Sequence, residues 1–237
     1  MAMKNTTKYS NKSNTKGFDK LAPKYDIGNR VASLGFDKSW RRKMVSLLPT
    51  GKIKVADLAC GTGDVAITAA KARPEAAITG FDLSDEMMSF GREKVEKAGF
   101  SGRIQLLHGD ALNIDAPDSS FDAVTMSFGL RNMPSLEGVF KETRRIIKPD
   151  GVAVFMEFSR PQNRFLRFWH GVYLRHILPR TTYLATGNAE MLKYLVVSIM
   201  QFPEVADVQT LMRECGFKSS TIQMMFGAVT IYKMKPV

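Results

Sequence analysis

A glycine-rich turn that directly follows a short apolar run constrains the fold of this chain more than any other feature. Residues 55–64 read Val-Ala-Asp-Leu-Ala-Cys-Gly-Thr-Gly-Asp, and a helical stretch follows them. Gly61 and Gly63 let the backbone turn sharply and approach a ligand without an intervening Cβ. The helix that follows presents free N–H groups to an anion. The segment therefore predicts a strand, a ligand-binding turn and a helix at the carboxyl edge of a parallel sheet.

The next apolar run ends in a carboxylate. Residues 77–82 predict a second strand that ends at Asp82, and a carboxylate there can accept both hydroxyls of a ribose. Two classes of nucleoside ligand fit this pattern: S-adenosylmethionine and a nicotinamide dinucleotide. The dinucleotide fits because Gly61, Gly63 and Ala66 also satisfy the loose fingerprint of its binding sites. A plain strand–turn–helix with an incidental aspartate is the third interpretation.

Two further acidic positions favour S-adenosylmethionine over a dinucleotide. Asp57 lies inside the first predicted strand, where a carboxylate is costly unless it holds a charged group such as a ligand's ammonium. Asp110 and Ala111 follow a third apolar run at residues 104–108, and we expect them to form an adenine-binding edge. S-adenosylmethionine is therefore the expected cofactor.

Strand and helix patterns alternate along the middle of the chain. The predicted strands are residues 54–59, 77–82, 104–108, 121–127 and 152–158, with helices at 64–72, 84–99 and 136–147 between them. After a helix at residues 205–215, two closing strands near 220–225 and 228–234 predict a hairpin around Phe226-Gly227. This rhythm predicts an α/β fold with a doubly wound, mostly parallel seven-stranded sheet and a C-terminal antiparallel hairpin.

The ends and the late middle of the chain differ from this rhythm. Residues 1–16 form a polar, lysine-bearing tail that we expect to be disordered. Residues 17–237 are then a single domain, opened by a short amphipathic helix at residues 18–29 with a loop around Gly28-Asn29. A second helix precedes Pro49. Residues 159–203, rich in aromatic and basic side chains, predict a helical insert on the substrate side.

The formal net charge of +11 leaves several partners open. Part of the excess lies in the tail, and the rest is compatible with nucleic acid, an anionic membrane or solvent alone. No apolar run reaches the roughly 20 residues of a membrane span, and no signal-peptide core opens the chain. We expect a cytoplasmic protein, with peripheral contact at the inner face of the membrane as an alternative. Two cysteines agree with a reducing compartment, and no metal site is expected because no Cys/His cluster has ligand spacing.

The motifs together resemble one family. The most specific is Ser127-Phe128-Gly129-Leu130-Arg131-Asn132, directly after the fourth predicted strand. The others are Phe18-Asp19-Lys20-Leu21-Ala22 with Tyr25-Asp26, Trp40-Arg41-Arg42, the glycine turn, Glu157-Phe158-Ser159, and Tyr194-Leu195 with Ser198-Ile199 and Phe202-Pro203. This set resembles the ubiquinone/menaquinone biosynthesis C-methyltransferases, which are class I S-adenosylmethionine-dependent methyltransferases. The resemblance covers nearly the whole chain beyond the tail.

The resemblance implies an activity and a set of site residues. The activity is C-methylation of a prenylated quinol ring, in the first place demethylmenaquinol to menaquinol, and the oligomeric state is open between monomer and homo-oligomer. The cofactor contacts that it implies are Thr62, Asp82, Asp110, Ala111 and Ser127. It also implies that Arg131 and Asn132 face the acceptor ring, where the permanently charged guanidinium suits a phenolate oxygen.

The alternative function is a methyltransferase acting on RNA or another small molecule. The fourth strand is not followed by the Asn/Asp-Pro-Pro-aromatic tetrad that would bind a flipped amino base. No separate nucleic-acid module is evident, so no nucleic-acid partner is expected.

Overall fold

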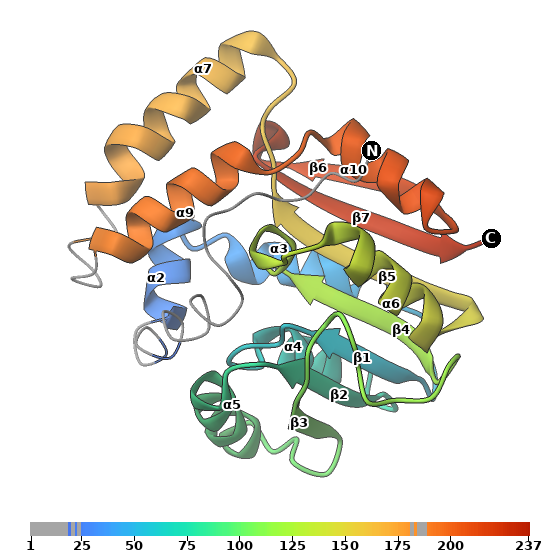
Figure 1. Cartoon of the computed structure of the whole chain (residues 1–237). Coiled ribbons are helices and arrows are strands. Elements are labelled where there is room, and N and C mark those ends of the chain that lie inside the picture. The colour runs from blue at the N-terminus through green and yellow to red at the C-terminus, as the bar shows by residue number, and fades with distance from the viewer. Residues whose placement is uncertain (1–18, 20–21, 23–24, 181–182, 184–188) are drawn as a thin grey trace.

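Seven strands form one mixed sheet in this computed structural model, which describes residues 19, 22, 25–180, 183 and 189–237. The predicted tail at residues 1–16 lies outside the described part. The strand order across the sheet is β3-β2-β1-β4-β5-β7-β6 (Figure 1). The strands are β1 (Lys54–Leu58), β2 (Ala77–Asp82), β3 (Ile104–His108), β4 (Phe121–Ser127), β5 (Ile147–Phe158), β6 (Phe217–Met224) and β7 (Val229–Pro236).

The pairing confirms the predicted mostly parallel sheet with a C-terminal antiparallel hairpin. β1 to β5 pair in parallel, and β7 runs antiparallel to both β5 and β6. The hairpin turns through η4 (Met225–Gly227), where Phe226 and Gly227 have φ angles of 55° and 93°. Because the chain moves outward from β1 to β3 and then returns to the other side of β1, the strand order reverses between β1 and β4. A crevice opens at the carboxyl ends of the strands at such a point.

Helices cover both faces of this sheet. α3 (Asp37–Val45), α4 (Asp64–Ala72) and α5 (Asp85–Lys97) bury Met44, Ala66 and Met88 in a cluster on one face. α6 (Leu136–Ile146) and α10 (Val205–Glu214) bury Phe140 and Val208 in a second cluster on the other face. The predicted N-cap of α5 is confirmed, since Ser84 Oγ accepts the backbone N–H of Met87 at 3.1 Å.

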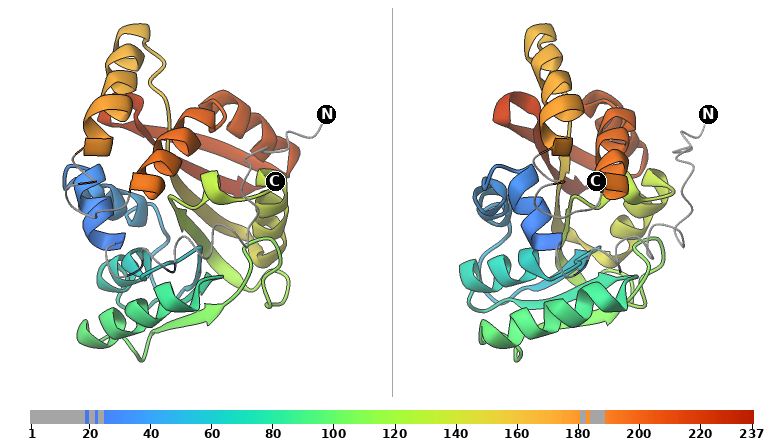
Figure 2. Two further views of the ribbon diagram at one scale, coloured as in Figure 1. Left: turned by 60° about the vertical axis from the view of Figure 1, so that its left-hand side comes forward. Right: turned by 90° about the vertical axis from the view of Figure 1, so that its left-hand side faces the viewer.

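Residues 164–201, after β5, are helical wherever the structure describes them. This segment contains α7 (Arg164–Val172), the π-helical turn η3 (Tyr173–Ile177) and α9 (Ala189–Gln201). Leu174, Leu178 and Ile199 form a small core of their own. Figure 2 shows α7 projecting beyond the sheet. None of the helices in the described part is long and apolar enough to cross a bilayer.

The predicted loop at Gly28-Asn29 is wrong, because α2 (Tyr25–Ala32) runs through both residues. The chain turns instead after Ala32, where Leu34 and Gly35 have φ angles of 52° and 80°. The Gly35 N–H donates to the Arg30 carbonyl at 2.8 Å and closes the helix end. The glycine that ends the helix is therefore Gly35.

The start of β5 also differs from the prediction. β5 begins at Ile147, not at Val152, because Phe121 of β4 already pairs with Ile147. Ala123 pairs with Val152, so residues 148–151 are accommodated as an irregularity in the register. β6 likewise begins at Phe217, three residues earlier than predicted.

Candidate functional site

The turn between β1 and α4 forms the floor of the candidate site. Ala59, Gly61 and Gly63 all have positive φ, and Gly63 at 75° is the N-cap of α4. α5 packs directly on this turn: a Cβ on Gly91 would lie 3.2 Å from the carbonyl carbon of Thr62 and 3.3 Å from the Gly61 oxygen. Gly91, which the sequence patterns did not single out, therefore lets α5 support the turn.

Asp82 connects this turn to the end of β2. One carboxylate oxygen accepts the Gly61 N–H at 2.8 Å, and the other accepts the Ser84 N–H at 2.9 Å. Burial raises the pKa of Asp82, although these backbone donors oppose the shift. Each oxygen keeps a second lone pair, so the carboxylate retains acceptor capacity toward a ligand.

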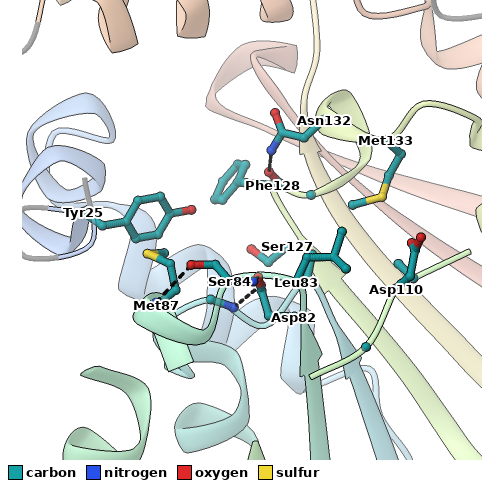
Figure 3. Close-up of a pocket in the computed structure, with 15 residues that line it drawn as sticks. Tyr25, Asp82, Leu83, Ser84, Met87, Asp110, Ser127, Phe128, Asn132 and Met133 are labelled. Carbon is teal, nitrogen blue, oxygen red and sulfur yellow. Dashed lines mark hydrogen bonds between the residues drawn. The ribbon is translucent and has the colours of Figure 1, made fainter. Parts of the chain in front are cut away.

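A cavity opens above Asp82 (Figure 3). The space inside it is about 720 Å³ when the solvent-open mouth is included. The lining residues are Tyr25, Ala59, Gly61, Asp82, Leu83, Ser84, Met87, Gly109, Asp110, Ala111, Ser127, Phe128, Gly129, Asn132 and Met133. Figure 3 shows the Tyr25 hydroxyl pointing into this space from α2, opposite Asp110 and Met133. Burial raises the pKa of Tyr25, so its hydroxyl remains protonated at neutral pH.

A smaller cavity adjoins the first and has Asp57 in its wall. Asp57 is fully buried in β1, where one oxygen accepts the Thr125 hydroxyl at 2.7 Å and the other has no partner. Burial raises the pKa of Asp57 to about 7, although the Thr125 hydroxyl and a weak contact from the Ala66 backbone N–H oppose the shift. A buried carboxylate oxygen without a donor is costly, and a ligand's ammonium would satisfy it. Thr62 and Ser127 also line this cavity.

A chain of ion pairs fastens α2 and α3 to the glycine turn. Lys94 Nζ lies 2.6 Å from an Asp26 oxygen, 2.5 Å from an Asp64 oxygen and 3.0 Å from the Thr62 hydroxyl. Asp64 also pairs with Arg41 at 2.9 Å. Burial alone would raise the pKa of Asp64, but Arg41 and Lys94 hold it below its usual value. This network places Tyr25 of α2 over the cavities.

Arg131 lies in η2 (Leu130–Asn132) and is held by Glu157 of β5. Glu157 is fully buried and accepts the Arg131 guanidinium at 2.9 Å and the Arg131 backbone N–H at 3.1 Å. The guanidinium also donates to the Phe128 carbonyl and lies 5.5 Å from the centre of the Phe158 ring. Phe158 stacks on Phe128, which lines both cavities. Arg131 itself lines neither cavity.

Asn132, the next residue, faces the larger cavity. Its amide nitrogen donates to the Phe128 carbonyl at 3.3 Å, and its amide oxygen accepts the Tyr194 hydroxyl at 2.8 Å. Tyr194 belongs to α9, so the helical insert contributes directly to the site.

Most of the residues expected at the site, whether as cofactor contacts or at the acceptor ring, surround the two cavities. Gly61, Asp82, Asp110, Ala111, Ser127 and Asn132 line the larger one, and Gly61, Thr62 and Ser127 line the smaller one. Gly63 and Arg131 line neither. The sequence patterns assigned no role to Tyr25 and Arg41, although the Tyr25-Asp26 and Trp40-Arg41-Arg42 motifs contain both. Within the described residues, no three His, Cys, Asp or Glu side chains form a group that could hold a metal ion.

Comparisons with known sequences identify close relatives. The model of the ubiE/COQ5 methyltransferase family matches residues 6–234. A demethylmenaquinone methyltransferase from Deinococcus radiodurans is 37% identical over 211 residues, which are 89% of this chain and 87% of that protein. A ubiquinone/menaquinone biosynthesis C-methyltransferase UbiE from Geotalea daltonii is 37% identical over 91% of this chain and 92% of its own length.

Solved structures share the fold at lower identity. A SAM-dependent methyltransferase from Aquifex aeolicus superposes with a TM-score of 0.64 at 16% identity, over 91% of this chain and 97% of that one. A SAM-dependent methyltransferase from Thermotoga maritima, described as a possible histamine N-methyltransferase, gives 0.63 at 19% identity, over 93% and 98%. At this identity the likeness concerns the fold, which is that of class I methyltransferases.

Proposed function

The chain belongs to the ubiE/COQ5 methyltransferase family, and we propose that it uses S-adenosylmethionine to methylate a ring carbon of a prenylated quinol, in the first place demethylmenaquinol. The names of its relatives support this acceptor class. The observation that carries the proposal is the buried Asp57 oxygen without a hydrogen-bond partner, in the wall of a cavity that adjoins the one above Asp82.

The donor set fits the proposed cofactor. Asp57 would take the ammonium group, and its second oxygen is the buried atom that lacks a donor. Asp82 would accept the ribose hydroxyls with the lone pairs that its backbone donors leave free. Asp110 and Ala111 would border the adenine at the far end of the larger cavity. S-adenosylmethionine, when bound, supplies an electrophilic methyl group that a ring carbon of the acceptor can attack in line.

The chain's own residues would orient the acceptor and exclude water. Tyr25 and Phe128 line both cavities, and Asn132, which accepts the Tyr194 hydroxyl of α9, lines the larger one. Two aromatic rings and an amide suit a flat ring that carries hydroxyl groups. Closure of this kind strengthens electrostatic contacts to a phenolate and fixes the approach of the two reactants.

We assign Asn132 and Arg131 different parts in this reaction. The Asn132 amide would contact the acceptor's oxygen. Arg131 would act from behind the cavity wall, because Glu157 and the Phe128 carbonyl hold its guanidinium there. From that position it holds the Phe128–Asn132 turn and so orients the Asn132 amide toward the acceptor. The ring proton of the acceptor would leave to water.

Direct assay of the purified protein tests this function. It would be incubated with S-adenosylmethionine and a short-tailed demethylmenaquinol kept reduced, and the products analysed by mass spectrometry. We expect S-adenosylhomocysteine and a quinol heavier by one methylene to form in equal amounts. Asn132→Ala should abolish most turnover, while Asn113→Ala, at an exposed position outside both cavities, should not. Cofactor binding without methylation of any quinol would refute the proposal.

A further inference from the structure

An unpartnered aromatic stripe runs along α7. Phe165, Phe168 and Trp169 are 69%, 63% and 54% exposed, and this helix has no buried residue. Their spacing places them on one side of the helix. Their rings contact each other edge to face, with centroids 6.3 Å apart for Phe165–Trp169 and 5.5 Å for Phe168–Trp169. A cluster of three exposed aromatic rings on a soluble surface marks an interaction site.

The exposed apolar side chains of the described residues concentrate at the end of the molecule that carries α7. Apart from Leu107 and Val237, they lie on α2, η3, α7, α9, η4 and the segments joined to these elements. The Tyr173 hydroxyl of η3 donates to the Ala32 carbonyl of α2 at 3.3 Å, which joins two of these elements. Figures 1 and 2 show α2, α7 and α9 at the same end. The stripe is therefore part of a wider apolar end of the molecule.

This end is also strongly basic. Residues 159–180 include five arginines and no aspartate or glutamate. Arg160 and Arg167 pair with Glu204 of the loop before α10. Arg164 and Arg175 are exposed, and among the described residues neither has a carboxylate partner. Together with Phe168 they line a groove between α7, η3 and α9. Two uncompensated guanidiniums beside exposed aromatic rings suit a surface that is both anionic and apolar.

We propose that α7 docks this protein on an anionic phospholipid bilayer. Phe165, Phe168 and Trp169 enter the boundary between headgroups and acyl chains, and Arg164 and Arg175 contact lipid phosphates. Amphipathic helices that lie in this boundary present aromatic residues on one side and arginine or lysine on the other. The docking itself is independent of which molecule is methylated.

One consequence of docking rests on the proposed function. α9 packs beside η3 through Ile199 and Leu174, and its Tyr194 hydrogen-bonds Asn132 at the larger cavity. A docked α7 would therefore hold the acceptor side of the site close to the bilayer. A prenylated acceptor could then reach the cavity with its tail still in the membrane.

Trp169 provides an intrinsic reporter of docking. The chain has two tryptophans, and Trp40 is 6% exposed. A Trp40→Phe variant leaves Trp169 as the single tryptophan, whose emission can be excited selectively. We expect vesicles of phosphatidylcholine with phosphatidylglycerol to shift Trp169 emission to the blue, and lipids brominated on their acyl chains to quench it. Pure phosphatidylcholine vesicles should bind much more weakly, and added salt should weaken the binding. Unchanged Trp169 emission with both kinds of vesicle would overturn the proposal.

Vesicle sedimentation of full-chain variants separates the contribution of the aromatic rings from that of the arginines. Phe165→Ser with Phe168→Ser should abolish sedimentation with anionic vesicles. Arg164→Gln and Arg175→Gln should each lower the vesicle affinity about fivefold. Leu107→Ser, which removes an exposed apolar side chain from β3 at the other side of the sheet, is the matched control and should bind as the wild type does. Because α7 has no buried residue, its variants should keep the wild-type melting temperature.

The remaining outcomes also decide the proposal. Equal binding of the α7 variants and the wild type would overturn it. Self-association that depends on the stripe, without vesicle binding, would overturn it too and assign the face to a second copy of the chain. Methylation of a short-tailed quinol in detergent keeps the two proposals separate. The α7 variants should retain this activity, and its absence in the wild type with intact vesicle binding would refute the proposed function alone.

Discussion

Asp57→Asn tests the smaller cavity most directly, because it removes a buried charge and keeps the shape of the side chain. Burial raises the pKa of Asp57 to about 7 from its ordinary value of 3.8. The unfolded chain exposes this carboxyl, so its pKa there stays near 3.8. Between these two pH values the folded Asp57 keeps its proton while the unfolded one has lost it. The folded state then binds more protons, and stability falls as the pH rises.

The difference between the folded and unfolded pKa values of Asp57 sets the size of this change in stability. The interval between 3.8 and about 7 corresponds to about 4 kcal/mol. The wild type bears this cost in full above about pH 7 and not at all below about pH 4. Asparagine carries no charge, and its amide oxygen can still accept the Thr125 hydroxyl. We therefore expect Asp57→Asn to raise the free energy of unfolding at about pH 8 by up to about 4 kcal/mol. The rise in melting temperature is then at most roughly 8–16 °C, because the buried N–H donors of the new amide lack an acceptor and offset part of the gain.

The assay is urea unfolding of the ligand-free protein, followed by circular dichroism at several values between about pH 4.5 and pH 8. The advantage of Asp57→Asn over the wild type should shrink toward zero at the acidic end. Asp115→Asn, at an exposed position, is the matched control and should change stability little at any pH. A variant less stable than the wild type at about pH 8, or an advantage independent of pH, would refute the reasoning.

The same substitution should weaken the cofactor while it stabilises the fold. A ligand ammonium beside Asp57 would favour the charged carboxylate and lower its pKa. Binding to the wild type near pH 7 should therefore release a fraction of a proton, visible in calorimetry as a heat that depends on the buffer. Asp57→Asn should show weak binding and lack this dependence. Proton release of equal size in both proteins would assign it to another group.

Three further substitutions test other parts of the site. Asp82→Ala should lower S-adenosylmethionine affinity by on the order of 2–3 kcal/mol, roughly 30- to 150-fold in calorimetry; affinity within a few-fold of the wild type would contradict this. Glu157→Gln leaves the Arg131 guanidinium buried without its counter-charge, so urea unfolding should show a loss of about 3–5 kcal/mol together with reduced turnover. A loss below about 1 kcal/mol would mean that the pair is not a tightly buried one. Gly91→Ala forces a Cβ against the glycine turn and should cost about 1–3 kcal/mol of stability, with weaker cofactor binding; an unchanged protein would show that α5 can move aside.

Local patterns were sufficient to predict the sheet and to place the glycine turn and Asp82 at one edge of it. Each strand carries its own apolar run, and the starts of α5, α6 and α7 carry a capping side chain. The glycine turn and Asp82 are separated by one helix and one strand, and parallel strands bring their carboxyl ends to one edge. The failures were local as well. Gly28 lies inside α2 because Gly35 ends the helix, and β5 starts early because residues 148–151 fit into the sheet as an irregularity.

Contacts between distant parts of the chain could not be predicted in this way. Arg131 was expected at the acceptor ring, and nothing in its motif indicates that Glu157, 26 residues later, holds the guanidinium in a buried pair. Tyr194 and Asn132 are 62 residues apart and meet only because α9 folds back over the site. Whether the second Asp57 oxygen finds a hydrogen-bond donor depends on the groups that several elements bring around it. Spacing along a chain specifies strands, turns and helix ends, whereas burial and the choice of partner for each charge arise only when the whole chain has packed.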